Sequence, residues 1–285
     1  MIPAQFDYVA PESVEDALAA LAAAGDEAKV LAGGQSLLPV LRMRLNAPEV
    51  VVDLGRIPEL REISDDGEAI VIGSMATHSA VVASDLVREH AALLARTVAE
   101  VADPQVRHRG TVGGALVHAD PAGDVGAAAL ALDAEFTIVG PGGSTRTVAG
   151  ADFFVDLFET AVGEGELLTR IRIPKHTGWG AHYEKFVRVA HQWSIVAVAA
   201  TVRVEGGTIA EARVGLTNMG STPLRARSVE EALVGRPATE DAVRAAAASA
   251  ADGTNPPSDL NGDSDYRKHL ATVLTRRAVL AAAQG

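Results

Sequence analysis

The sequence predicts an α+β protein made of three consecutive units, and three observations indicate this fold class. Runs of β-branched residues at strand length alternate with longer segments that carry apolar residues at helical spacing. The composition, with 48% hydrophobic and 22% charged residues, is that of an ordinary globular protein without long disordered tracts. A chain of 285 residues is long enough to form two or three hydrophobic cores.

The first unit, residues 1–54, is expected to be a small α/β unit. Ser13 and the acidic residues after it form a capping-box pattern, which predicts the start of an amphipathic helix. This helix is expected to end near Gly25. Residues 29–31 and 50–54 have the composition of strands, and the second strand is expected to be buried on both faces.

The second unit, residues 55–177, is expected to be a larger α+β unit that ends in a glycine-containing connector at 177–180. Its elements are recognised by apolar spacing and by the turns that bound them. The predicted helices are 79–85, 87–101 and a helix that ends at Leu132, and the predicted strands are 70–73, 136–139 and 167–174.

The third unit, residues 178–285, is expected to contain strands followed by helices. The strand-like segments are 193–204 and 210–216. A second capping-box pattern that begins at Ser228 predicts a helix there, the alanine-rich segment 244–251 predicts another, and a final helix is expected from Tyr266.

Composition excludes several classes of function. A net charge of −12 argues against nucleic acid as a partner, because the basic surface that such proteins need is missing. The chain has no cysteine and therefore no disulfide and no cysteine-ligated iron–sulfur cluster. The N-terminal residues lack the pattern of a secretion signal, and apolar runs such as 195–200 fall short of the ~20 residues that span a bilayer. We expect a soluble cytoplasmic protein that does not cross a membrane.

Two glycine-rich segments are the main candidates for ligand binding. Gly33 and Gly34 follow a short strand, and a similar segment lies far downstream at 110–114. Paired glycines let the chain turn with its amides exposed, and consecutive N–H groups can cradle the oxygens of a phosphate. A plain turn remains the alternative for either segment taken singly. A P-loop is excluded because Gln35 stands where a lysine is required, and the glycine spacing of a Rossmann fold is also missing.

Other candidate sites are not supported by the sequence. His118 and Asp120 have no third ligand at a recognisable spacing, so we predict no metal site. The alternating polar residues of 259–265 begin like a calcium loop but lack the glycine at its sixth position, and Leu270 replaces the final glutamate. Ser36 lacks the sequence context of a nucleophile, so hydrogen bonding to a phosphate is the expected role.

The combination of the two glycine-rich segments carries a resemblance to a known family. The first motif consists of Ala32, Gly33, Gly34, Gln35, Ser36 and Leu37, and the second of Thr111, Val112, Gly113, Gly114 and Ala115. Together they resemble the two FAD-contacting motifs of the medium, FAD-binding subunits of the carbon monoxide dehydrogenase and xanthine dehydrogenase family of molybdenum hydroxylases. The likeness covers essentially the whole chain, although close relatives often have His where this chain has Gln35.

The resemblance implies a fold, a domain division and a mode of FAD binding. Residues 1–177 would form a two-part FAD-binding domain of the PCMH type, like that of vanillyl-alcohol oxidase, with subdomains 1–54 and 55–177. Residues 178–285 would form a C-terminal α+β domain of the carbon monoxide dehydrogenase flavoprotein type. The backbone amides of the glycine pairs, Gly33, Gly34, Gly113 and Gly114, would bind the FAD diphosphate.

The resemblance also implies contacts outside the two motifs. It places Asp124 near the FAD ribose, with the N-cap of the next helix as the alternative. Lys185 corresponds to a lysine near the flavin, with a surface lysine as the alternative. Trp193 would lie beside the isoalloxazine ring, and a core tryptophan is the competing interpretation. Leu167 is included among the contacts, and the acid that relatives carry before the aromatic residue is replaced by Gln192.

The function implied by the resemblance is electron transfer through FAD. A large subunit with a molybdenum–pterin centre would oxidise the substrate, a small subunit would carry two two-iron two-sulfur clusters, and FAD would deliver electrons to a quinone or another acceptor. The complex would be a dimer of heterotrimers that is associated with the inner membrane face through its partners. No side chain is expected to be a catalytic acid or base. The alternatives are the flavin subunit of a nicotine-, purine- or aldehyde-oxidising complex, a stand-alone flavin oxidase, and a scaffold protein without a cofactor.

Overall fold

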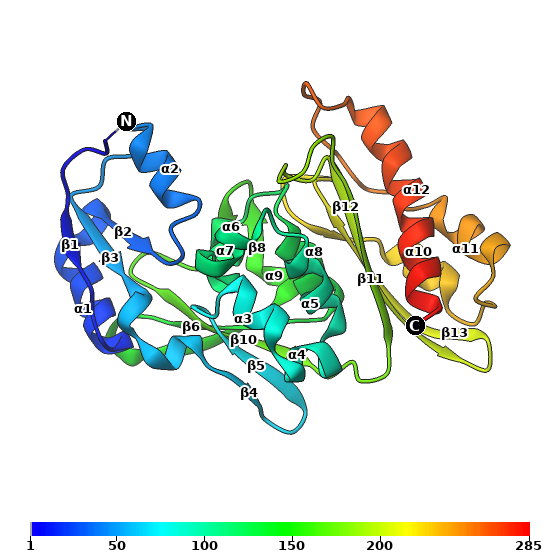
Figure 1. Cartoon of the computed structure of the whole chain (residues 1–285), viewed down its shortest axis with the longest axis horizontal. Coiled ribbons are helices and arrows are strands. Elements are labelled where there is room, and N and C mark those ends of the chain that lie inside the picture. Colours follow the sequence, from blue (N-terminus) through cyan, green and yellow to red (C-terminus); the bar gives the residue numbers. More distant parts are fainter. Residues whose placement is uncertain (1) are drawn as a thin grey trace.

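The structure is a computed structural model, and it describes residues 2–285. Three units follow one another along the long axis of the molecule, in the order of the sequence (Figure 1). Each unit is built around its own sheet, and hydrophobic clusters fill the spaces between the sheets and their helices. This is the mixed α+β architecture that the sequence predicts.

The first unit is a three-stranded parallel sheet, in the order β1-β3-β2, with helix α1 packed against it. The predicted cap is confirmed, because Ser13 Oγ accepts a hydrogen bond of 3.0 Å from the amide of Asp16. Helix α1 ends at Gly25, whose φ of 57° lies in the left-handed region. The elements are β1 (Asp7–Val9), α1 (Val14–Ala24), β2 (Ala28–Leu31), α2 (Leu37–Arg42) and β3 (Val50–Asp53).

The second unit is a five-stranded antiparallel sheet, in the order β4-β5-β10-β6-β7, covered by helices. The predicted strand 167–174 is confirmed and lies in the middle of this sheet. The elements are β4 (Ile63–Asp65), β5 (Ala69–Gly73), α3 (His78–Ala83), α4 (Asp85–His90), α5 (Ala92–Ala99), α6 (Pro104–Arg109), α7 (Val112–His118), α8 (Asp124–Ala131), β6 (Glu135–Val139), β7 (Thr145–Ala149), α9 (Gly150–Phe153), the hairpin β8 (Phe154–Asp156) and β9 (Glu159–Thr160), and β10 (Leu167–Pro174).

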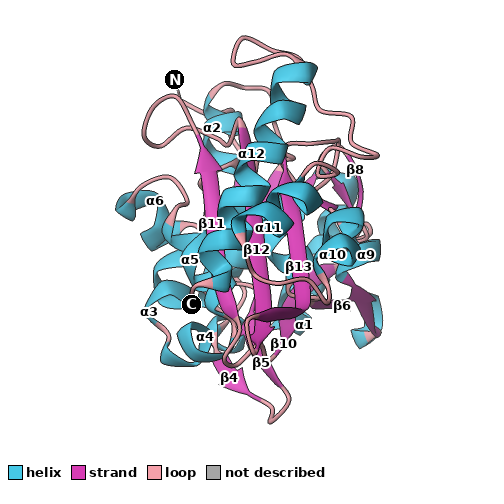
Figure 2. Ribbon diagram, turned by 90° about the vertical axis from the view of Figure 1, so that its right-hand side faces the viewer, coloured by secondary structure: helices cyan, strands magenta, loops and turns pink. Residues whose placement is uncertain are grey.

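The third unit is a four-stranded antiparallel sheet, in the order β11-β12-β13-β14. Helices α10, α11 and α12 cover its outer face (Figure 2), and α5 and α8 of the second unit pack on its inner face. Strand β12 is therefore buried on both faces: Val196 and Val198 belong to the outer cluster, whereas Ala197 and Ala199 belong to the inner one. The elements are β11 (Gly180–Phe186), β12 (Val196–Glu205), β13 (Thr208–Thr217), β14 (Leu224–Arg225), α10 (Arg227–Leu233), α11 (Glu240–Ala247) and α12 (Ser264–Ala283).

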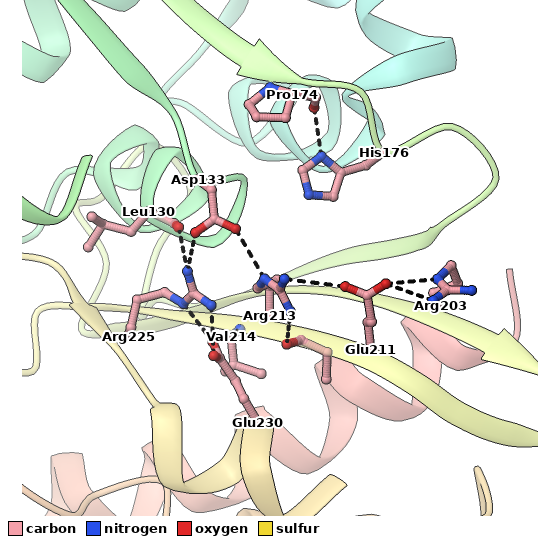
Figure 3. Close-up of polar contacts among 11 residues, drawn as sticks. Leu130, Asp133, Pro174, His176, Arg203, Glu211, Arg213, Val214, Arg225 and Glu230 are labelled. Atoms are coloured by element: carbon pink, nitrogen blue, oxygen red, sulfur yellow. Dashed lines mark hydrogen bonds and ion pairs between the residues drawn. The ribbon is translucent and has the colours of Figure 1, made fainter. Parts of the chain in front are cut away.

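Helix α8 joins the second and third units along its whole length. Its backbone lies so close to β13 that a Cβ on Gly215 would be 2.1 Å from the carbonyl oxygen of Ala127. At its C-terminal end, Asp133 accepts hydrogen bonds from Arg213 (3.1 Å) and Arg225 (2.6 Å) (Figure 3). Partial burial alone would raise the pKa of Asp133, but the two arginines outweigh it and lower the pKa. The third unit is thus fixed to the second by close backbone packing and by ion pairs.

Several details of the predicted elements are corrected by the structure. Residues 78–99 form three helices and not two, because Ser84 caps a new helix and Ala91 (φ −140°, ψ 48°) breaks the chain again. The capping box expected at Ser228 is wrong, since that serine lies inside α10 and Ala226 occupies the cap position. Strand β12 begins at Val196, so Trp193 lies in the preceding loop.

The sequence interpretation also missed whole elements. These are the short strands β1, β4, β7, β8, β9 and β14, the strand β11, and the helices α2, α6, α7 and α9. The final helix α12 begins at Ser264 with Asp263 as its cap, two residues before the predicted start. The division into domains 1–177 and 178–285 stays a prediction, and Ala181 and Tyr183 from the second part pack into the cluster of the first.

Candidate functional site

A cleft of about 570 Å³ lies where the three units meet. Its volume is within the range of small-molecule and cofactor sites. Fourteen of the fifteen predicted site residues line it: Ala32, Gly33, Gly34, Gln35, Ser36, Leu37, Thr111, Gly113, Gly114, Ala115, Asp124, Leu167, Lys185 and Trp193. The exception is Val112, whose side chain is 1% exposed and packs in the hydrophobic cluster of the second unit.

The loop between β2 and α2 presents free amide donors to this cleft. Gly34 adopts a φ of 76°, which a residue with a side chain rarely takes. Within residues 2–285, the backbone N–H groups from Gly33 to Ser36 have no hydrogen-bond partner in the protein. Successive free N–H groups in a turn form a site for an anion. The prediction that this loop can bind phosphate oxygens therefore has a geometric basis.

The second glycine-rich segment plays a different part from the one expected. Its glycines lie in the first turn of helix α7, and their amides are already used: Gly113 donates to the carbonyl oxygen of Ser74 (3.0 Å) and Gly114 donates to Thr111 Oγ1 (3.1 Å). These two N–H groups cannot serve a diphosphate without losing those bonds. The expectation that all four glycine amides are free for the ligand is therefore wrong for this pair.

Close packing explains why glycine is needed in both segments. A Cβ on Gly33 would lie 2.4 Å from the carbonyl oxygen of Arg109, and a Cβ on Gly113 would lie 2.5 Å from Ser74 Cβ. A Cβ on Gly114 would lie 3.1 Å from Ala32 Cβ. The glycines bring the two segments into direct backbone contact, and this contact shapes one wall of the cleft.

Asp124 is the centre of a buried polar cluster in the cleft wall. Its carboxylate accepts hydrogen bonds from Tyr183 Oη (2.6 Å), Ser194 Oγ (2.7 Å) and Lys185 Nζ (2.8 Å). The cap of α8 is Gly123, so the alternative role of Asp124 as an N-cap is wrong. The aspartate on α8 thus holds side chains from β11 and from the loop before β12.

Lys185 and Trp193 are placed by the same part of the third unit. The side chain of Lys185 is 9% exposed and also donates to the carbonyl oxygen of Glu100 (3.0 Å), so a plain surface lysine is the wrong interpretation. Trp193 is 54% exposed on the cleft rim, which excludes a core tryptophan.

Burial raises the pKa of Tyr183 far above its ordinary value, and the Asp124 charge adds to this effect, so this phenol stays protonated.

Sequence reasoning missed several residues of the cleft, above all Ser74 and His78. Ser74 lies between β5 and α3, and His78 is the first residue of α3. They are 4% and 3% exposed, and each has a polar side-chain atom that is buried without a partner in the described chain. No motif singled them out, because only the fold brings this turn to the second glycine-rich segment. Within residues 2–285 the structure contains no group of three His, Cys, Asp or Glu side chains that could hold a metal ion.

These features fit a dinucleotide that carries a flat ring. The free amides suit a diphosphate, the buried lysine supplies one cation, and the exposed indole can cover a ring. A model of the FAD-binding domain in molybdopterin dehydrogenase matches residues 4–176. The chain belongs to this family of flavoproteins. A model of the C-terminal domain of the carbon monoxide dehydrogenase flavoprotein matches residues 181–282.

Known members of the flavoprotein family resemble this chain over its full length. The medium chain of carbon monoxide dehydrogenase from Hydrogenophaga pseudoflava is 41% identical over 285 residues, covering 99% of this chain and 98% of its own. The glyceraldehyde dehydrogenase medium chain of Sulfolobus acidocaldarius is 34% identical over 278 residues, covering 98% of both chains. A solved structure of the Hydrogenophaga enzyme, which lacks the Mo-pyranopterin moiety, superposes with a TM-score of 0.95 at 42% identity, covering 99% of this chain and 98% of that chain.

The comparisons bear out the cofactor and the class of protein. The chain is an FAD-binding flavoprotein and an oxidoreductase subunit of the molybdenum hydroxylase family. Among residues 2–285, no helix has both the length and the apolar character needed to cross a membrane. The fold is that of the carbon monoxide dehydrogenase flavoproteins, with the two-part FAD-binding domain of the PCMH type and the C-terminal domain that the resemblance implies.

Proposed function

We propose that this chain is the FAD-carrying electron-transfer subunit of a heterotrimeric aerobic carbon monoxide dehydrogenase. The observation that carries the proposal is a difference in sequence identity. Two carbon monoxide dehydrogenase medium chains are each 41% identical to this chain, whereas the medium chains of a glyceraldehyde dehydrogenase and a nicotine hydroxylase are each 34% identical to it. The cleft supports the same role, since it gathers amide donors, a buried lysine and an exposed indole.

The residues of the cleft have separate roles in this proposal. Bound FAD supplies the exchange of one and two electrons, while the protein supplies position and charge. The amides of Gly33 to Ser36 bind the diphosphate, and the closely packed glycines leave room for it. Asp124 holds Lys185 against the cleft wall, and Trp193 shields one side of the ring.

The proposed partners are those of a molybdenum hydroxylase complex, and the cysteine content of this chain bears on one of them. This chain has no cysteine, so the iron–sulfur clusters that feed the flavin belong to a small subunit with two two-iron two-sulfur clusters. A large molybdenum–pterin subunit oxidises the substrate, and a quinone or a similar acceptor takes the electrons. The complex is a cytoplasmic dimer of heterotrimers that meets the inner membrane face through its partners.

Co-purification from the native cells tests this proposal. The expected result is a complex of three chains with FAD, iron and molybdenum that reduces a dye in the presence of carbon monoxide. A complex that oxidises glyceraldehyde, nicotine or a purine instead would keep the subunit role and overturn the substrate. A flavin-containing chain that is isolated alone and turns over a small molecule would replace the proposal with a stand-alone oxidase.

A variant of the second motif tests the cofactor site. Gly114→Val adds a side chain next to Thr111 Oγ1, which would lie 2.7 Å from the new Cβ. We expect loss of bound FAD with retention of the partner subunits. Gly220→Val is the matched control, because Gly220 does not line the cleft and the atom nearest to its added Cβ is the flexible side-chain end of Leu224 at 3.2 Å. An unchanged FAD content in Gly114→Val would refute the assignment of this wall to the cofactor.

A further inference from the structure

The tip of the hairpin formed by β8 and β9 exposes large apolar side chains outside the cleft. Val155, Leu157 and Phe158 are 57%, 56% and 53% exposed, and they lie within four consecutive residues. None of the three lines the cleft. Exposed apolar residues that occur singly need no explanation, whereas a contiguous group marks an interaction site. These three residues, called the hairpin tip below, are therefore a candidate docking surface.

The turn of this hairpin departs from the usual chemistry of tight turns. Asp156 pairs with Glu159 across the hairpin, so Leu157 and Phe158 form a two-residue turn. Such turns favour glycine, asparagine and aspartate, which tolerate a positive φ. Phe158 instead adopts a φ of 57°, in the left-handed region that a bulky residue rarely takes. Strained backbone of this kind is concentrated at functional sites, and here it places an aromatic ring on the surface.

The base of the hairpin is anchored in the second unit. The ring of Phe154 packs edge-on against that of Phe153, with 5.1 Å between the centroids, and Phe153 is fully buried. The amide of Ala161 donates to the carbonyl oxygen of Phe153 (2.8 Å). A surface that is already fixed in place loses less conformational entropy on binding than a mobile loop does. The hairpin thus presents its tip in an orientation that is ready for a partner.

Acidic residues without basic partners surround the hairpin tip. Asp152, Asp156 and Glu159 are exposed, and none of them forms an ion pair within residues 2–285. Three unpaired negative charges attract a positively charged surface and repel a negative one. The surface that complements the hairpin tip is therefore an apolar hollow with lysine or arginine at its edge.

The position of the hairpin tip indicates which partner it would meet. The ring of Phe158 lies 5.3 Å from that of His118, which is the last residue of α7 and lines the cleft. Val162, two residues after β9, also lines the cleft. A subunit that passes electrons to the flavin must lie beside the cleft, whereas a subunit that only binds the substrate has no such need. The position therefore favours the electron donor.

We propose that the hairpin tip is a docking surface for the iron–sulfur subunit of the complex, which meets it with an apolar hollow that has a basic edge. The inference rests on the proposed function, because that function supplies the iron–sulfur subunit. A second copy of this chain does not fit, since a net charge of −12 makes two copies repel each other. The contact holds the electron donor beside the wall of the cleft that carries His118.

Phe158→Asn is the variant that tests this docking surface. Asparagine tolerates a positive φ, so the variant keeps the turn while it removes the aromatic ring. The complex is purified from the native cells through a tagged FAD chain, and mass photometry over a dilution series measures the concentration at which the iron–sulfur subunit dissociates. We expect that concentration to rise by about tenfold or more, the effect of losing an aromatic anchor from an interface.

Two further measurements separate docking from a structural role. The melting temperature of the FAD chain alone should be unchanged or higher in Phe158→Asn, because asparagine relieves the strain of the turn. A side chain needed for folding would give the opposite result. Val234→Ser is the matched control, since Val234 is 51% exposed at the end of α10, and it should leave both the melting temperature and the dissociation concentration unchanged.

The charge of the partner surface is tested with Asp156→Asn combined with Glu159→Gln. The wild-type complex should dissociate at a higher protein concentration as salt is added, because salt screens the attraction between opposite charges. The double variant removes two of the three unpaired charges without changing the size of the side chains, so it should reduce this salt dependence. A steeper salt dependence in the double variant would contradict a basic partner surface.

Three results would overturn the docking surface. An unchanged dissociation concentration in Phe158→Asn would show that the hairpin tip lies outside the interface. Loss of the large subunit with retention of the iron–sulfur subunit would show that the wrong partner has been assigned. Loss of FAD from Phe158→Asn would make the hairpin a part of the cofactor site. A wild-type chain that purifies without any partner would instead refute the proposed function.

Discussion

Replacing Asp124 with Asn is the sharpest test of how the cleft is held together. The carboxylate is buried, with 4% of its side chain exposed, and its partner Lys185 is 9% exposed. The Asn side chain has the same shape, and its oxygen can still accept from Tyr183 and Ser194. Its amide nitrogen, however, faces the ammonium group at the 2.8 Å position where the second carboxylate oxygen now accepts. The variant therefore removes one charge and leaves the other buried.

The size of the effect follows from this geometry. Removing one partner of a buried ion pair destabilises a protein by about 3–5 kcal/mol, because the remaining charge stays in a poorly solvated site. Lys185 keeps its hydrogen bond to the carbonyl oxygen of Glu100, which places the expected loss at the low end, about 3 kcal/mol. For a chain of this size, that loss lowers the melting temperature by roughly 5 °C.

The assay is urea denaturation of the FAD-free chain, so that cofactor affinity does not enter the result. The double variant Asp124→Asn with Lys185→Met removes both charges and should recover at least half of the loss, which a double-mutant cycle measures. Asp85→Asn is the surface control, since its pair with Arg88 has side chains that are 91% and 54% exposed. We expect that control to change stability by less than about 0.5 kcal/mol. A wild-type stability in Asp124→Asn, or no recovery in the double variant, would refute the reasoning.

Three further predictions concern other parts of the structure. The pKa of His78 falls from 6.5 to about 4 on folding, so between these two pH values the unfolded chain binds more protons than the folded chain. The free energy of unfolding should therefore fall by up to ~3 kcal/mol as the pH drops from 6.5 to about 4. Urea denaturation at a series of pH values measures this slope, which His78→Gln should flatten. Gly33→Ala places a Cβ 2.4 Å from the carbonyl oxygen of Arg109, and this clash should destabilise the chain by about 1–3 kcal/mol. The same variant should bind FAD more weakly, which an absorbance titration with FAD would measure. Arg225→Met leaves the buried carboxylate of Glu230 without its arginine and removes the ion pair with Asp133 that joins the third unit to the second. The free energy of unfolding should fall by ~3 kcal/mol, and an unchanged denaturation midpoint in urea would contradict a structural role for these two pairs.

The sequence by itself determined the parts of this protein that depend on local pattern. The cap at Ser13, the central strand 167–174 and the first glycine-rich loop were all predictable, because capping residues, β-branched runs and paired glycines act within a few residues. The short strands were not, since β1 and β4 are three residues long and exist only because neighbouring strands supply their hydrogen bonds.

Only the tertiary structure decided how the cleft works. The sequence indicated Asp124, Lys185 and Trp193 separately, but the fold brings residues 61 positions apart into a buried ion pair and leaves the tryptophan on the rim. It also uses the amides of Gly113 and Gly114 internally, which no local pattern reveals. Burial, hydrogen-bond competition and close backbone approach are properties of segments distant in the chain, and so they are settled only when those segments pack together.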